Sequence, residues 1–282
     1  MRQTFLVSTC LVGGLLLSAC EKSETATVER AFQDVNVVDE TDLNDVMLTA
    51  ADPNEAVSYY MRALKGNSSR VDLQRGLAKS LVRAKRNIEA VTAWETVVSL
   101  EGATNDDQVD LADAMIRTGD WEGAKTTLNG VPPTHETFKR YRLEAMVADA
   151  NQEWKKADSF YEIAVSLTTR PASVMNNWGY SKLTRGDFSE AERLFGEAIR
   201  QDQALFTAKN NLVLARGAQR NYSLPVIPMG QIERAQLLHT LALTAIKQGD
   251  TSTGEGLLRD AISTHPQHFE EAVRSLRALE SA

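Results

Sequence analysis

The sequence predicts an all-α protein, a right-handed solenoid of about six helix pairs, some of them degenerate, with a C-terminal capping helix. An alanine recurs at a nearly constant spacing, at Ala56, Ala90, Ala124, Ala157 and Ala191. A bulky apolar residue lies four positions after each alanine, and a small or β-branched residue lies seven positions after it. These offsets share one face of a helix. Between the helices of a pair stands Gly-Asp, beginning at Gly119, Gly186 and Gly249, where glycine ends the first helix in a left-handed conformation.

The alanine spacing, about 34 residues, is the period of the tetratricopeptide repeat (TPR), and the predicted units follow one another along the chain. The first unit has a degenerate leading helix near 42–50 and a second helix near 54–65. Further units are expected at 71–101, 105–131, 138–168 and 173–203. The unit at 173–203 matches the pattern best. The unit at 105–131 has a short second helix because Pro132 and Pro133 stop it.

The array is interrupted where the next alanine is due, because position 225 is a proline. A leading helix is still expected there, since Asn210-Asn211 repeats Asn176-Asn177 at the same spacing. Pro225 and a second proline three positions later exclude a continuous helix over about 221–230. This loop either packs across the solenoid or serves as a docking element. One more unit and a capping helix over 269–279 are expected to complete the array.

The segment 1–19 has the features of a signal peptide. Arg2 gives a basic start, and the apolar run at 5–17 is too short to span a bilayer. The run ends in Leu17-Ser18-Ala19-Cys20, which is typical of a bacterial lipobox. We expect cleavage before Cys20 and acylation of its thiol, which would anchor the chain to a membrane. The alternative is a soluble periplasmic protein in which this cysteine is incidental.

Residues 20–40 are polar and acidic and are expected to form a flexible tether, followed by the solenoid over 41–282. The sequence has 31 Lys and Arg against 38 Asp and Glu, a net charge of −7. Loss of the signal peptide removes only Arg2 among the charged residues, which gives −8. An acidic body argues against nucleic acid as a partner. By resemblance to other Gram-negative lipoproteins, Glu21 after the cysteine leads us to expect the outer membrane, on its periplasmic face.

The sequence offers no constellation for catalysis. His265 and His268 are separated by a proline and have no third metal ligand in view. The segment Gly249–Gly254 begins like a phosphate loop, but the lysine that such a loop needs is missing. There is no Gly-x-Ser-x-Gly elbow, and the mature chain would have no free cysteine nucleophile. We therefore expect no enzymatic activity, no cofactor, no metal and no small-molecule substrate.

The leading helices of such a solenoid line a concave face, along which a bound peptide runs. The register predicts that the following side chains face this groove: Lys139, Arg142, Asn176, Asn177, Tyr180, Asn210, Asn211, Leu214, His239 and Leu243. The paired amides could hydrogen-bond a peptide backbone without reading its sequence. They could equally cap backbone groups inside the stack, and the sequence leaves both possibilities open.

The stretch from Met175 to Leu279, about a third of the chain, resembles the TadD family of TPR lipoproteins from the Flp, or tight adherence (Tad), pilus system. The matching segments are 176–179, 186–192, 209–212, 224–225, 236–249 and 265–269, together with the lipobox at Cys20. The resemblance implies an outer-membrane scaffold with a pilotin-like role, which binds the secretin or other Tad components. The alternative is a general envelope lipoprotein that scaffolds peptidoglycan synthesis or outer-membrane assembly.

Overall fold

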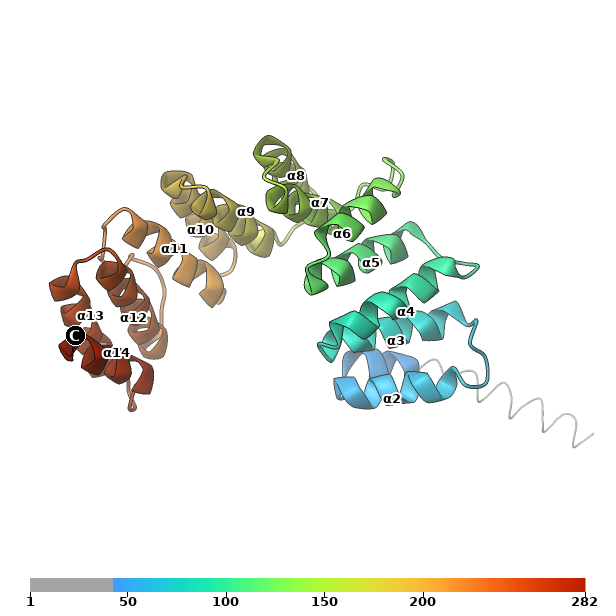
Figure 1. Cartoon of the computed structure of the whole chain (residues 1–282), viewed down its shortest axis with the longest axis horizontal. Coiled ribbons are helices and arrows are strands. Elements are labelled where there is room, and N and C mark those ends of the chain that lie inside the picture. The colour runs from blue at the N-terminus through green and yellow to red at the C-terminus, as the bar shows by residue number, and fades with distance from the viewer. Residues whose placement is uncertain (1–42, 282) are drawn as a thin grey trace, which may run out of the picture. The chain divides into compact units, whose positions relative to one another are not determined.

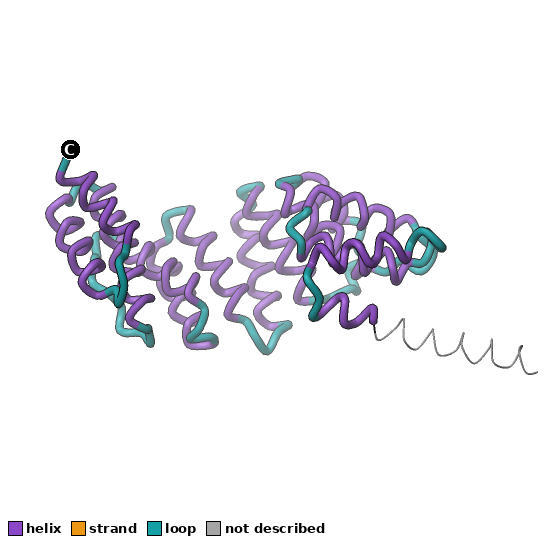
Figure 2. Tube along the Cα trace, turned by 90° about the horizontal axis from the view of Figure 1, so that it is seen from below, coloured by secondary structure: helices purple, strands orange, loops and turns teal. Residues whose placement is uncertain are grey.

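A computed structural model describes residues 43–281. The predicted signal peptide, Cys20 and the acidic tether therefore lie outside the described residues. The chain divides into two compact units, Met1–Ala103 and Thr104–Ala282. Helices and loops account for all of the described residues, and no strand is found among them (Figure 2). The predicted all-α class is confirmed.

The described part of the first unit contains a helical segment at 43–49 and the helices α2 (Pro53–Ala63), α3 (Val71–Arg83) and α4 (Asn87–Ser99) (Figure 1). Asp52 begins α2, because its carboxylate accepts hydrogen bonds from the first free backbone N–H groups of the helix. Tyr60 of α2 is fully buried against Gly76 of α3. A Cβ at position 76 would lie 2.3 Å from the tyrosine ring, so this close approach of the two helices requires glycine.

The second unit is a stack of helix pairs. Its helices are α5 (Asn105–Thr118), α6 (Trp121–Asn129), α7 (Phe138–Ala150), α8 (Trp154–Ser166), α9 (Ala172–Thr184), α10 (Phe188–Gln201), α11 (Phe206–Ala218), α12 (Gln231–Lys247), α13 (Thr251–Thr264) and α14 (Glu270–Glu280). The pairs are α5–α6, α7–α8, α9–α10 and α12–α13. Helix α11 packs between α10 and α12 without a second helix of its own, and α14 packs on α13.

The turns inside the pairs follow the sequence pattern. Gly119, Gly186 and Gly249 have φ of 82°, 83° and 83°, the left-handed conformation that glycine adopts without strain. The aspartate after each glycine caps the next helix with its side chain. In three other turns, the position that corresponds to this glycine is occupied by Lys85, Gln152 or Arg220. These residues also adopt the left-handed conformation, with φ of 59°, 58° and 60°.

The recurring alanines lie where the helices of a pair meet. All five are fully buried. The bulky residue four positions after each alanine is no more than 2% exposed, at Tyr60, Trp94, Leu128, Tyr161 and Phe195. In the α9–α10 pair, a Cβ on Gly179 would lie 2.7 Å from the ring of Phe195. Large side chains on one helix thus fill the space that small residues leave on its partner.

The proline-containing loop takes the place of the helix that would follow α11. Its residues 221–230 are not helical. Ile227 packs against the apolar core formed by α10 and α11, whereas Leu224 and Met229 pack against α12. The hydroxyl of Tyr222 donates a 2.7 Å hydrogen bond to the side chain of Gln248. Of the two roles left open by the sequence, packing across the array is the one that these contacts describe.

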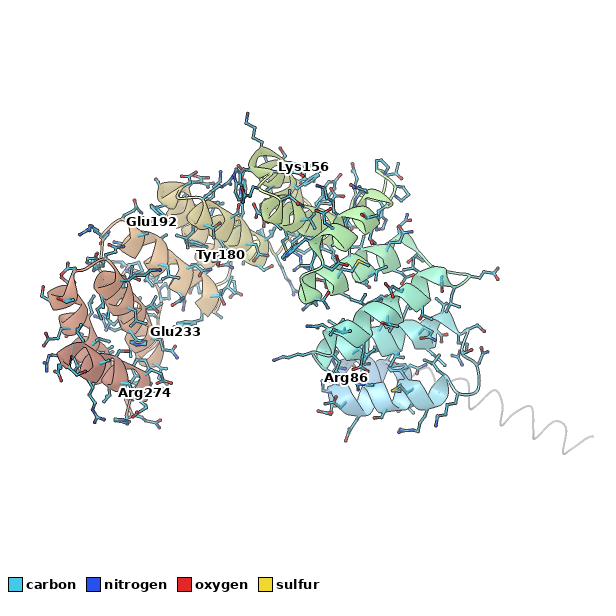
Figure 3. The ribbon with its side chains drawn as sticks, in the orientation of Figure 1. Arg86, Lys156, Tyr180, Glu192, Glu233 and Arg274 are labelled. Carbon is cyan, nitrogen blue, oxygen red and sulfur yellow. The ribbon has the colours of Figure 1, made fainter. Side chains whose placement is uncertain are left out.

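The last helix covers the apolar edge of the final pair. Ala272 of α14 is fully buried, and Leu276 and Leu279 pack against the same cluster, which includes Leu258 of α13 and Phe269. Arg274 points away from this cluster (Figure 3). Helix α14 therefore closes the described end of the stack with a polar outer face, as a capping helix must.

Candidate functional site

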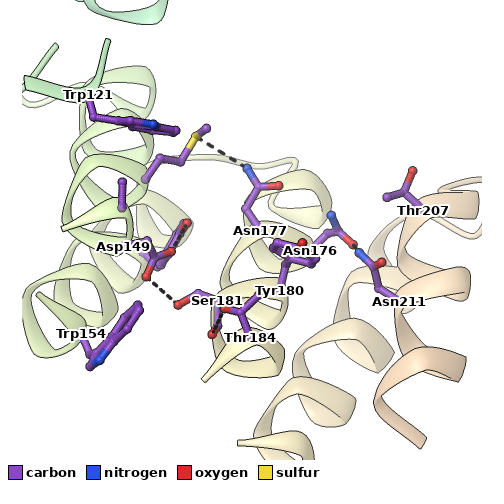
Figure 4. A pocket seen from close by; sticks show the side chains of 13 residues that line it. Trp121, Asp149, Trp154, Asn176, Asn177, Tyr180, Ser181, Thr184, Thr207 and Asn211 are labelled. Carbon is purple, nitrogen blue, oxygen red and sulfur yellow. Dashed lines mark hydrogen bonds between the residues drawn. The ribbon is translucent and has the colours of Figure 1, made fainter. Parts of the chain in front are cut away.

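A pocket of about 510 Å³ lies in the second unit (Figure 4). It is lined by side chains of α6, α7, α8, α9 and α11: Trp121, Met146, Asp149, Ala150, Trp154, Tyr161, Asn176, Asn177, Tyr180, Ser181, Thr184, Thr207 and Asn211. Four of these residues are aromatic, and Asp149 is the one charged residue among them. Apolar walls with a few convergent polar groups are typical of a ligand-binding site.

Asp149 is held in place by neighbours on two other helices. Its Oδ1 accepts a 2.7 Å hydrogen bond from the hydroxyl of Ser181, and its Oδ2 accepts a 2.8 Å hydrogen bond from the hydroxyl of Tyr161. Burial raises the pKa of Asp149, and these two hydrogen bonds partly offset that effect. The carboxylate is therefore a fixed group at the pocket wall, with lone pairs left for a ligand.

A second aspartate, which does not line the pocket, holds together two of the helices that do. Asp158 of α8 accepts hydrogen bonds from Trp178 Nε1 at 2.7 Å and from Lys182 Nζ at 3.1 Å, and it forms an ion pair with Arg185. Burial alone would raise the pKa of Asp158, but these three donors from α9 and its C-terminal end outweigh it and the pKa is lowered. The Trp178 ring also stacks on Tyr161, with centroids 6.1 Å apart. These contacts fix α9 against α8, and with it one wall of the pocket.

The paired asparagines link successive leading helices. The Nδ2 of Asn211 in α11 donates a 3.0 Å hydrogen bond to Oδ1 of Asn176 in α9. The hydroxyl of Thr240 in α12 donates a 2.8 Å hydrogen bond to Oδ1 of Asn210. Within the part of the chain that the structure describes, Asn176 Nδ2 and Asn211 Oδ1 have no protein partner. The pair thus keeps one donor and one acceptor for a ligand at the pocket.

The pocket brings together Asn176, Asn177, Tyr180 and Asn211 of the predicted groove residues. The six others lie outside its lining: Lys139, Arg142, Asn210, Leu214, His239 and Leu243. Lys139 forms ion pairs with two aspartates of α5, Asp110 and Asp113. The guanidinium of Arg142 lies 6.0 Å from the ring centroid of Phe138. Leu243 is 46% exposed on α12.

His239 packs against the capping segment. A 3.1 Å hydrogen bond joins its Nε2 to the hydroxyl of Ser275, and its ring meets Phe269 edge-on with centroids 5.4 Å apart. Burial lowers the pKa of His239, and the nearby Glu271 opposes this effect without cancelling it. The folded protein therefore binds a proton at this site less readily than the unfolded chain does.

This proton linkage predicts an acid-sensitive C-terminal end. As the pH falls through the ordinary histidine value of about 6.5, the unfolded chain takes up the proton first, so the stability of the fold decreases. His239→Gln is expected to remove this part of the loss. The measurement is the melting temperature of both proteins between pH 7.5 and 5. Curves that stay parallel over this range would contradict the prediction. His268→Gln, at an exposed position beside Glu270, is the matched control for loss of a histidine.

Several pocket residues were not predicted. Met146 lies one repeat before Tyr180 and shares its register, so the repeat pattern could have found it. Asp149, near the end of α7, and Thr184, near the end of α9, occupy adjacent positions of the repeat. Trp121 and Trp154 each begin the second helix of a pair, a place that the groove pattern leaves aside. No spacing in the sequence shows that these two rings reach the pocket.

The helix pairs form a solenoid with the fold of tetratricopeptide repeats, and solved structures agree. A chain of the Cut9–Hcn1 hetero-tetramer of APC/C aligns with a TM-score of 0.61 at 12% identity, covering 84% of this chain and 48% of that chain. A TPR protein from Parabacteroides merdae aligns at 0.53 and 15% identity, covering 92% and 99%. The C-terminal part of a TPR protein from Cytophaga hutchinsonii aligns at 0.53 and 12% identity, covering 83% and 98%.

At these identities the likeness shows the fold alone, and the chain spans about half the length of the Cut9–Hcn1 chain that it matches. No family model matches the chain, and no curated protein matches its sequence. None of the described helices is long and apolar enough to cross a membrane. Among residues 43–281, no cluster of three or more His, Cys, Asp or Glu side chains could hold a metal ion.

Proposed function

We propose that the chain is a non-catalytic binding scaffold, anchored to the outer membrane through acylated Cys20 and facing the periplasm. Its solenoid binds an extended segment of a Flp/Tad pilus component and so helps the secretin to assemble, as a pilotin does. The observation that carries the binding role is the pocket lined by α6–α9 and α11, where aromatic walls meet the unpaired donor and acceptor of Asn176 and Asn211. The lipobox and the resemblance of 175–279 to the TadD family support the location and the partner.

The mechanism in this proposal is stoichiometric. The lipid localises the protein to the membrane, and the solenoid binds the partner segment against α8 and α9, which are fixed to each other by the contacts of Asp158. Because α9 is fixed before the ligand arrives, little conformational entropy is lost when a peptide binds. An extended peptide presents a backbone N–H and C=O that the amides can satisfy without reading its sequence.

Affinity capture tests the proposal. The lipidated full chain is recovered from detergent-solubilised envelopes, and the proteins that copurify are identified by mass spectrometry. Recovery of the secretin or other Tad components, lost in the Cys20→Ser protein that is not acylated, is the expected result. Recovery of peptidoglycan synthases or outer-membrane assembly factors without pilus proteins would overturn the pilus role. It would favour the general envelope scaffold instead.

The amide pair gives a separate prediction for binding. Asn176→Ala combined with Asn211→Ala is expected to weaken binding of the captured partner segment while the protein stays folded. The loss of the Asn211–Asn176 hydrogen bond costs about 1 kcal/mol of stability. Urea unfolding and titration with a synthetic peptide of the partner segment measure the two effects. If the double variant is less stable but its folded form binds the peptide as tightly as the wild type does, the amides are structural and the proposed contact is wrong.

A further inference from the structure

The side chains that line the pocket favour one kind of ligand group, in addition to binding a peptide backbone. Its one charged lining residue is a carboxylate, and four of its lining residues are aromatic. We infer that this pocket takes a positively charged side chain, arginine or lysine, from the partner segment. The inference rests on the proposed binding function and specifies which residue of the partner enters the pocket.

The carboxylate supplies the first attraction. Asp149 lies near Trp154 and Ser181 on the pocket wall (Figure 4), and the hydroxyl of Tyr161 contacts it. Its two internal hydrogen bonds come from neutral hydroxyls, so its negative charge is not neutralised by the groups that hold it. Arg185 exerts an opposing electrostatic effect that lowers the pKa of Asp149, but its guanidinium is paired with Asp158. A cation from the partner would therefore meet an oriented carboxylate in a partly desolvated site, where the attraction is stronger than in water.

The aromatic walls supply the second attraction. The face of a tryptophan or tyrosine ring attracts a cation. In this protein the Trp154 ring already holds a guanidinium, that of Arg185, 5.5 Å from its centroid. Trp121 and Tyr180 have no such internal cation among the described residues. Tyr180 projects from α9 with 54% of its surface exposed (Figure 3). These two rings can flank an incoming side chain.

Charge also argues for a partner rather than for this chain's own N-terminal segment. Residues 20–42 contain seven acidic and two basic residues, and the whole chain has a net charge of −7. A segment or a second copy of that sign is repelled by the pocket carboxylate, whereas a basic segment of another protein is attracted. The occupant that fits is an extended basic segment, with one cationic side chain in the pocket and its backbone on Asn176 and Asn211.

Blocked nonapeptides with a single variable central residue test the inference. They carry arginine, lysine, citrulline, norleucine or glutamate between glycine and serine residues, and they are titrated calorimetrically into the acylated full chain in detergent. We expect the arginine and lysine peptides to bind about tenfold more tightly than the citrulline and norleucine peptides. Asp149→Asn should remove most of this preference and leave only the contribution of the aromatic rings. Glu162→Gln, at an exposed acid of α8 outside the pocket, makes the same change in charge and should preserve it.

A second variant guards against misfolding, because Asp149→Asn also alters the hydrogen bonds to Ser181 and Tyr161. Tyr180→Leu keeps an apolar side chain at a position without an internal hydrogen bond in the described contacts. It should weaken the arginine and lysine peptides and leave the citrulline and norleucine peptides unchanged. Norleucine binding as tightly as arginine, or a preference that Asp149→Asn leaves undiminished, would overturn the inference and leave the proposed function standing. If no peptide binds the wild-type protein, both fail.

Discussion

Replacing Phe195 with alanine is expected to lower the free energy of unfolding of the second unit by about 3–5 kcal/mol. Phe195 is fully buried in the cluster formed by α10 and α11, with Leu212 and the proline-loop residue Ile227 around it. Its ring also fills the space above Gly179, so its removal opens a cavity at a helix crossing that cannot close without moving α9. Urea unfolding followed by circular dichroism measures the loss.

Val226→Ala is the matched control, since it also shortens an apolar side chain but at a fully exposed position. It should change stability by no more than about 0.5 kcal/mol. Gly179→Ala on its own should destabilise, because the new Cβ would lie 2.7 Å from the Phe195 ring. In the Phe195→Leu background that penalty should shrink. Equal penalties in the two backgrounds would show that the two positions do not share one packing contact.

The sequence could predict this contact because both residues belong to the repeat. A bulky residue such as Phe195 recurs four positions after each alanine of the repeat, and every repeat needs the same close approach between its helices. The left-handed turn at Gly186 was visible for the same reason. At Gln152 the identical turn lacks its glycine. It could be found only from its place in the period, because the local residue gives no signal.

Only part of the pocket could be predicted from the sequence, and the reason is physical. Repeat register places Asn176 and Tyr180 on the inner side of their helix, as it does in any such protein. The role of Asp149 depends on hydroxyls of Ser181 and Tyr161, which belong to other helices and follow no spacing. The register predicted that His239 faces the groove and gave no sign of its contacts with Ser275 and Phe269 of the capping segment. Contacts made across unlike elements are therefore the part that periodicity cannot supply.

Removing the carboxylate of Glu233 is expected to destabilise the second unit by about 3–5 kcal/mol, although this residue is partly exposed (Figure 3). Its partner is Lys209 of α11, which is only 2% exposed. The ammonium donates hydrogen bonds of 2.9 and 3.2 Å to the two oxygens of Glu233. Glu233→Ala would leave this buried charge without a counterion. It would also free the backbone N–H of Gly230, whose hydrogen bond Glu233 accepts at the start of α12.

The partner variant separates these two losses. Lys209→Met removes the buried charge and keeps the bulk, so alone it should cost much less than Glu233→Ala, because the carboxylate that it leaves unpaired is partly exposed. The double variant with Glu233→Ala should have a free energy of unfolding only about 1 kcal/mol below that of the wild type, and the lost helix cap accounts for this difference.

The pair also carries a pH signature with a definite sign. The hydrogen bond from Lys209 lowers the pKa of Glu233 below its usual value of 4.5. Its stabilisation is therefore complete above that pH and is lost as the pH falls through the lowered value in the folded protein. Lys209→Met should flatten this acid limb of the unfolding curve. If the double variant were no more stable than Glu233→Ala, the stranded ammonium could not be the cause of the loss, and the helix cap would account for it.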